Sequence, residues 1–125
     1  MKKNRKIYDL LILLFILILI VFGGCSFPIT REIKYEVNGT VPMADITYKN
    51  FTEGTDKLTD VELPWSKTFS VTIEANRSFV ANLTATNRTK GSLTASIYVN
   101  DILVKTSTDS GSTQYVYVSE YIDNY

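Results

Sequence analysis

Beyond residue 31, apolar and polar side chains alternate one by one, and this period of two restricts the chain to β-structure. Ile33, Tyr35 and Val37, for example, are separated from one another by charged residues. Successive side chains of a strand point to opposite faces of a sheet, so such a segment has one dry face and one wet face. The alternation recurs along the chain and predicts strands at residues 32–37, 44–49, 69–74, 79–86, 93–99, 102–106 and 113–121.

Seven short strands separated by turn signals are typical of a β-sandwich, so we expect an all-β antiparallel domain over residues 32–121. Asn100-Asp101 suits a tight hairpin turn because both residue types tolerate positive φ. We expect a loop at residues 107–112 and a long irregular stretch at residues 50–65, where Leu58 and Val61 indicate a short extra strand. The leading core positions are expected to be Phe69, Val71, Ile73, Leu83, Ile97 and Val99.

The first 25 residues have the composition of an export signal. Four basic residues open the chain, thirteen apolar residues follow at 10–22, and Gly23, Gly24 and Cys25 come next. A basic start, a short apolar stretch and small residues before a cut describe a secretory signal peptide. Phe22-Gly23-Gly24-Cys25 also resembles a bacterial lipobox, a signal in which the cysteine becomes the first mature residue and carries a diacylglyceryl thioether.

We therefore predict a lipoprotein signal peptide at residues 1–24, lipid attachment at Cys25 and a tether at residues 25–31. The alternative is an uncleaved membrane anchor, because residues 10–27 give eighteen tolerable positions and a spanning helix needs about 17–25. In both cases the basic end stays in the cytoplasm. The remainder is then held at the cell membrane on its extracytoplasmic face.

Composition removes several function classes. Histidine is absent and cysteine occurs once, so Ser-His-Asp and Cys-His catalysis, His-bearing zinc sites and an intramolecular disulfide are excluded. Basic and acidic residues number 13 each, which gives no basic excess for nucleic acid. No carboxylate pair or activated nucleophile can be selected from the sequence, so we expect neither an enzyme nor a cofactor.

Five acids near the first loops are candidates for calcium ligation, since calcium prefers oxygen ligands. Their spacing matches no known metal loop, so we favour solvated side chains and expect no metal site. The five are Asp45, Glu53, Asp56, Asp60 and Glu62.

Four aromatic residues are candidates for partner binding. Trp65, the only tryptophan, is either an interface anchor or, as we favour, a ring that covers one end of the core. Tyr115, Tyr117 and Tyr121 share one face of the last predicted strand. They are either a surface for carbohydrate or protein, or ordinary residues of high β-propensity, and the sequence leaves both open.

Several segments resemble the MmpS family of small membrane-associated proteins. They are residues 35–40 (YEVNGT), 44–48 (ADITY), 63–69 (LPWSKTF) and 93–101 (LTASIYVND). The resemblance covers about residues 33–118, and the Leu-Pro-Trp-Ser-Lys block is its most specific part. It implies a transthyretin-like or Ig-like β-sandwich outside the membrane. It also implies an accessory role beside RND-type transporters that export lipids and siderophores.

The sequence thus favours a non-catalytic lipoprotein module that docks on an RND-type transporter or another envelope protein. The alternative is a surface lipoprotein that binds a ligand or glycan through the tyrosines or the long loop. A carboxylate-based glycosidase is a third hypothesis, and it would need two facing acids roughly 5–9.5 Å apart.

Overall fold

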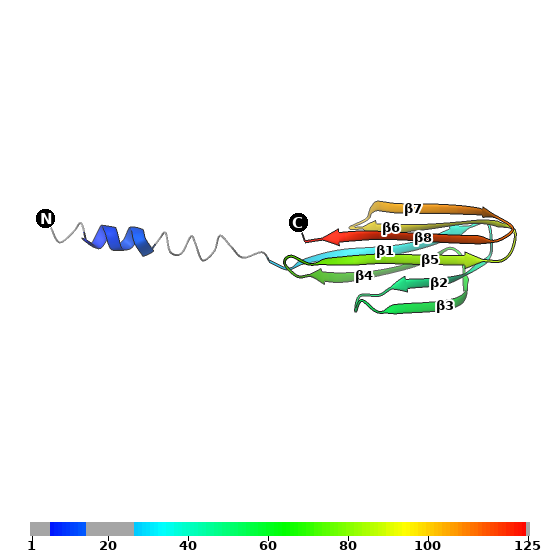
Figure 1. The fold of residues 1–125 in the computed structure, drawn as a ribbon, viewed down its shortest axis with the longest axis horizontal. Helices are drawn as coiled ribbons and strands as arrows, with labels where there is room; N and C mark the ends of the chain where they lie inside the picture. Colours follow the sequence, from blue (N-terminus) through cyan, green and yellow to red (C-terminus); the bar gives the residue numbers. More distant parts are fainter. Residues whose placement is uncertain (1–5, 15–26, 125) are drawn as a thin grey trace.

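Two antiparallel sheets form the folded part of the chain, as the computed structural model shows (Figure 1). The structure describes residues 6–14 and 27–124, and residues 6–14 are helical. Sheet A has the strand order β4-β1-β6-β7 and sheet B the order β3-β2-β5-β8. The strands are β1 (Ile29–Gly39), β2 (Met43–Lys49), β3 (Thr55–Glu62), β4 (Trp65–Ile73), β5 (Ser78–Asn87), β6 (Gly91–Val99), β7 (Ile102–Gly111) and β8 (Gln114–Asp123).

The expected all-β sandwich is confirmed, with eight strands in place of seven. The additional strand is β3, which lies inside the stretch expected to be irregular, and its partly buried residues include Leu58 and Val61. Asn100 and Asp101 form the expected turn, with φ of 49° and 64°. Within residues 6–14 and 27–124, no helix has the length and apolar character that a membrane crossing requires.

The loop expected at residues 107–112 is wrong, because β7 continues to Gly111. Serine and threonine hydroxyls hold this part of β7 to β6: the Thr94 and Thr108 oxygens are 2.7 Å apart. Asp109 then accepts a hydrogen bond from the Tyr115 amide at 2.9 Å. The polar composition indicated a loop here, whereas these residues form the solvent-exposed, polar half of an edge strand.

The core lies between the sheets and is built from the side chains that alternation placed on the dry faces. Val71, Ile73, Leu83 and Ile97 are buried as expected, and Phe69 and Val99 are partly buried against them. The other large buried residues come from every strand except β3 and β7: Ile33, Tyr35, Val37, Ile46, Leu93, Val116 and Val118 among them.

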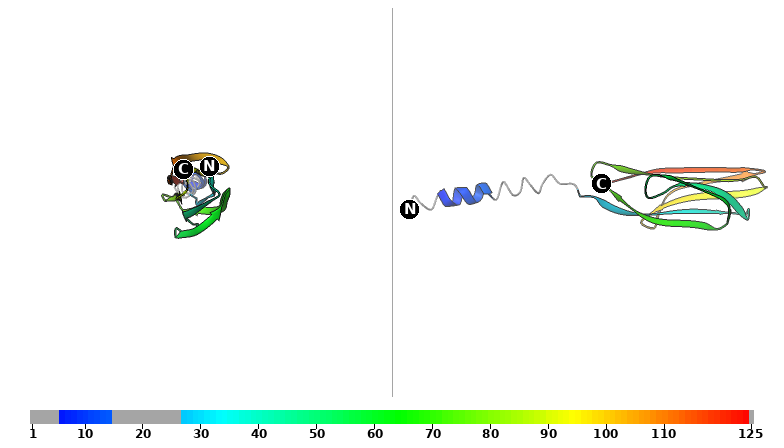
Figure 2. Two further views of the ribbon diagram at one scale, coloured as in Figure 1. Left: turned by 90° about the vertical axis from the view of Figure 1, so that its right-hand side faces the viewer. Right: turned by 90° about the horizontal axis from the view of Figure 1, so that it is seen from below.

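The end of the sandwich at which β1 begins is termed the proximal end, and the opposite end the distal end. The β4–β5 turn, the β6–β7 turn and the end of β8 all lie towards the proximal end (Figures 1 and 2). Here the side-chain amide of Asn124 donates hydrogen bonds to the carbonyl oxygens of Phe27 at 3.2 Å and Ile73 at 2.7 Å. β1 already begins at Ile29, so the last three residues of the expected tether belong to the sheet.

Candidate functional site

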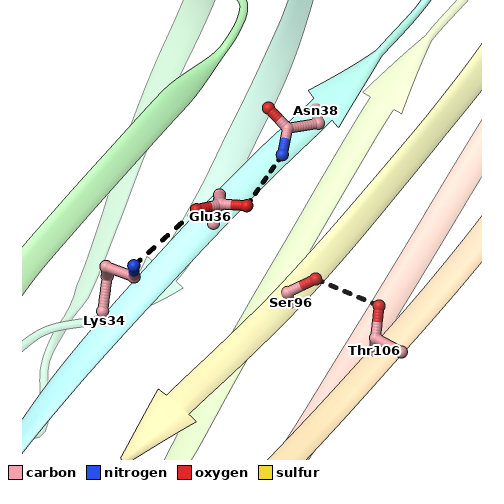
Figure 3. Close-up of polar contacts among 5 residues, drawn as sticks. All are labelled: Lys34, Glu36, Asn38, Ser96 and Thr106. Atoms are coloured by element: carbon pink, nitrogen blue, oxygen red, sulfur yellow. Dashed lines mark hydrogen bonds and ion pairs between the residues drawn. The ribbon is translucent and has the colours of Figure 1, made fainter. Parts of the chain in front are cut away.

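The outer face of sheet A is a polar surface that makes its own hydrogen bonds (Figure 3). Along β1, the Glu36 carboxylate accepts a hydrogen bond from the side-chain amide of Asn38 at 2.8 Å and forms an ion pair with Lys34 at 3.8 Å. Between β6 and β7, the hydroxyls of Ser96 and Thr106 are 3.0 Å apart. Because these groups satisfy one another by hydrogen bonds and an ion pair, this face has little to gain from an apolar partner.

The outer face of sheet B presents the three tyrosines of β8. Tyr115, Tyr117 and Tyr121 point away from the core, and all three are exposed. β8 is an edge of its sheet, since its hydrogen-bonded neighbour is β5. The Tyr117 hydroxyl accepts from the Asn82 side chain on β5 at 3.1 Å. The tyrosines therefore form a row of accessible rings, which is the arrangement that binding to a partner or a sugar would require.

Trp65 begins β4 and is partly buried against the core. Its ring centroid lies 5.5 Å from that of Tyr48, which in turn lies 5.6 Å from that of Tyr35. Phe69 and Phe79 continue the contacts. Such tilted aromatic pairs add to the stability that burial provides. The geometry gives Trp65 a packing role, and its exposed part remains the only portion available to a partner.

Tyr35 is a buried polar residue whose role the sequence did not indicate. Its hydroxyl donates to the Lys49 carbonyl oxygen at 2.8 Å and accepts from the Asn82 amide at 3.3 Å. The pairing of β2 with β5 ends at Tyr48 and Leu83. The Tyr35 hydroxyl therefore supplies a hydrogen-bond partner to the backbone groups of the next residues, Lys49 and Asn82. Burial raises the pKa of this hydroxyl to about 12.

A cleft of about 580 Å³ lies where the β2–β3 turn stops short of the proximal end. The turn supplies one wall of the cleft, with Phe51 and Glu53, and the β4–β5 turn supplies another, with Glu74 and Arg77. The buried side chains of Val71, Ile73 and Phe79 also line it. The cleft thus includes two exposed carboxylates, which is the residue type that the glycosidase hypothesis requires.

The acids considered for calcium organise the β2–β3 hairpin. Asp45 accepts from the Asp60 amide at 3.0 Å, and Asp56 accepts from the Asn50 side chain at 3.1 Å. In the part of the chain that the structure describes, no three His, Cys, Asp or Glu side chains are grouped so as to hold a metal ion. Cys25, the predicted lipid attachment site, lies outside the described residues.

The sequence did not identify an exposed apolar run at the start of β7. Ile102, Leu103 and Val104 are 68%, 49% and 38% exposed. A bulge accompanies them, because Tyr98 pairs with Leu103 and Ile97 with Lys105, which leaves Val104 as the extra residue. Alternation in residues 102–106 indicated an ordinary strand with one buried face, but β7 is a sheet edge and its proximal half is uncovered.

Comparison with known families shows which family the chain belongs to. The model of a family described as Mycobacterium membrane protein matches residues 26–119. The chain belongs to this family. It is the MmpS-like family that the motifs indicated, so that resemblance is confirmed, and membership makes this a membrane-associated protein. The match runs from before β1 into β8 and so covers nearly the whole sandwich. No curated protein matches the chain.

Proposed function

We propose that this chain is a membrane-anchored extracytoplasmic lipoprotein that assists an RND-type transporter in export. The observation that carries the proposal is the family match across the sandwich, because transporter accessory work is the role that the MmpS resemblance implies. The basic start and the apolar run at residues 10–22 supply the membrane attachment and its orientation. The sandwich supplies a rigid body that a transporter could contact.

The test is affinity purification of the full chain from detergent-solubilised membranes, followed by mass spectrometry. We expect an RND-type permease to be enriched over a control with an unrelated lipoprotein as bait. Recovery of no integral membrane protein above that control would contradict the proposal. The same preparation reports the anchor: a lipidated Cys25 at the mature N-terminus is expected, and an intact Met1 would show an uncleaved leader instead.

A second candidate function is ligand or glycan binding, which the exposed row of tyrosines on β8 favours. In that case a chain with Tyr115→Ala and Tyr117→Ala would lose binding to a glycan or lipid panel while keeping its thermal unfolding midpoint. Thr106→Ala with Thr108→Ala is the matched control, because these residues also lie on an edge strand but belong to the other sheet. Absence of binding by the unaltered chain would remove this candidate.

The proposed role is non-catalytic, and the acids of the cleft provide its test. Glu53 and Glu74 are exposed turn residues, and the chain has no histidine to act beside them. We expect no hydrolysis of a panel of chromogenic glycosides above the uncatalysed rate. Turnover that Glu53→Gln or Glu74→Gln abolishes would overturn the non-catalytic assignment and identify the cleft as an active site.

A further inference from the structure

Five exposed apolar side chains lie in the proximal half of the sandwich or just before it. Phe27, Ile102, Leu103, Val104 and Tyr121 are all exposed and are together termed the proximal apolar group. Phe27 precedes β1, residues 102–104 begin β7, and Tyr121 lies near the end of β8, so three elements contribute at one end (Figure 1). Ile102, Leu103 and Val104 are consecutive in the chain, and an exposed apolar patch on a domain can mark an interaction site.

The other three sheet edges differ from the start of β7. β3 carries Lys57, Asp60 and Glu62, and Asp60 has the positive φ of an irregular strand. β4 carries Lys67. At the distal end of β8, the backbone amide of Tyr115 donates a hydrogen bond to the Asp109 carboxylate. Charged residues and irregularities are the usual protection of an edge strand. Residues 102–104 are three consecutive exposed apolar side chains, which β3, β4 and β8 do not have, so this part of the edge is open to an apolar surface.

The chain itself determines which apolar surface lies nearby. Phe27 is two positions after Cys25, with Ser26 between them, and an extended chain spans at most about 3.6 Å per residue, so Phe27 lies within about 7 Å of the anchor position. The Asn124 side chain donates to the carbonyl oxygens of Phe27 and of Ile73 at the end of β4, which holds Phe27 to the sandwich. A membrane anchor at Cys25 therefore holds the proximal end at the lipid headgroups.

The register gives the position of residues 102–104 along the sandwich. Ile102 is opposite Val99, and Val99 is opposite Ile33, four residues into β1. At about 3.3 Å per residue, strands standing upright would place Ile102 about 20 Å beyond Phe27. Strands inclined towards the β7 edge bring Phe27 and residues 102–104 to one plane.

We propose that the proximal apolar group rests on the outer surface of the bilayer that anchors the chain, so that the sandwich lies inclined on the start of β7. The proposal rests on the anchored, extracytoplasmic part of the proposed function. Charges beside residues 102–104 are mixed, with Asp101 before them and Lys105 after them, so apolar contact rather than attraction to anionic lipid holds the domain. Zwitterionic lipid therefore suffices.

The test uses the full chain in phosphatidylcholine vesicles at a high ratio of lipid to protein. Leu103→Cys receives an environment-sensitive fluorophore, and lipids with a nitroxide at the headgroup or shallow acyl position act as quenchers. Ser110→Cys is the matched control because it is also exposed on β7 but lies at the distal end. The chain without an added cysteine gives the background from Cys25, and Val104→Cys is a second reporter should the first variant fail to fold.

We expect loss of fluorescence at position 103 and none at position 110, with no change in 0.5 M salt because the contact is apolar. No loss at position 103, or equal loss at both positions, overturns the proposal. Loss that disappears as the protein is diluted in the lipid assigns the surface to a second copy and also overturns it. These vesicles contain no transporter, so the result is independent of whether the transporter partner is found.

Discussion

Ile97 and Leu103 are large aliphatic side chains on neighbouring strands, yet they belong to two different apolar regions. Ile97 is fully buried in the interior between the sheets, whereas Leu103 is half exposed at the proximal end of β7. The interior is explained by folding, since burial of its side chains stabilises the sandwich. The apolar side chains of the proximal β7 segment keep about 40–70% of their surface in water, so burial in the domain accounts for them only in part. The comparison fits the proposal that this segment contacts a surface outside the domain.

The largest expected effect separates these two regions directly. Ile97→Ala removes a fully buried side chain and should lower the free energy of unfolding by about 2–5 kcal/mol. Leu103→Ala should change it by less than about 0.5 kcal/mol, as surface substitutions do. Both are measured by urea unfolding of the full chain in detergent. Similar losses for the two variants would mean that Leu103 is part of the core and would remove the contrast.

The buried hydroxyl of Tyr35 makes the interior sensitive to alkaline pH. Burial raises its pKa from 10.0 to about 12, so the folded state keeps the proton that the unfolded chain releases. The resulting stability is fully present below pH 10 and is lost between pH 10 and 12, at up to about 1.4 kcal/mol per pH unit. Tyr35→Phe should remove this part of the pH dependence in parallel unfolding titrations. Identical slopes for both chains would contradict the assignment.

At neutral pH the same substitution tests the hydrogen bonds alone. Tyr35→Phe keeps the aromatic contacts but leaves the Lys49 carbonyl and the Asn82 amide without the hydroxyl. Loss of a partner by a buried group costs about 1–3 kcal/mol, which should appear as a lower urea midpoint. Tyr117→Phe is the control, because its hydroxyl makes a solvent-exposed hydrogen bond and the substitution should be nearly neutral.

The smallest effect concerns the two halves of β7. Thr108→Ala removes the hydroxyl contact to Thr94 in the polar distal half, and a cross-strand pair of this kind contributes about 0.2–1 kcal/mol. We expect a loss in this range, together with faster hydrogen exchange of amides at residues 107–111. Exchange at residues 102–104 should be unchanged. Equal acceleration in both halves would show that β7 behaves as one unit.

Alternation along the chain predicted the sandwich, most of the core and the β6–β7 turn, because each depends on residues near one another in sequence. It failed at β7, where serine and threonine at residues 107–110 indicated a loop. The cross-strand contact of Thr108 with Thr94 cannot be read without the register. β3 was only suggested by Leu58 and Val61, because an edge strand buries few side chains.

The candidate surfaces were predictable only in part. The three tyrosines on β8 share a face as alternation required, and their exposure follows from β8 being an edge. The role of Tyr35 depends on where β2 ends, and the exposure of Ile102, Leu103 and Val104 depends on strand order. Neither is a local property of the sequence. A period of two identifies which side chains share a face, but it does not show whether another strand covers that face.

Photo-cross-linking in native membranes tests most directly whether the proximal β7 segment, unlike the interior and the distal half, is a contact surface. A photoreactive amino acid replaces Leu103 in one chain and Ser110 in another, both on exposed positions of β7. The account predicts adducts at position 103, with lipid as the captured molecule, and none at position 110. Absence of adducts at position 103, or equal yields at the two positions, would contradict it.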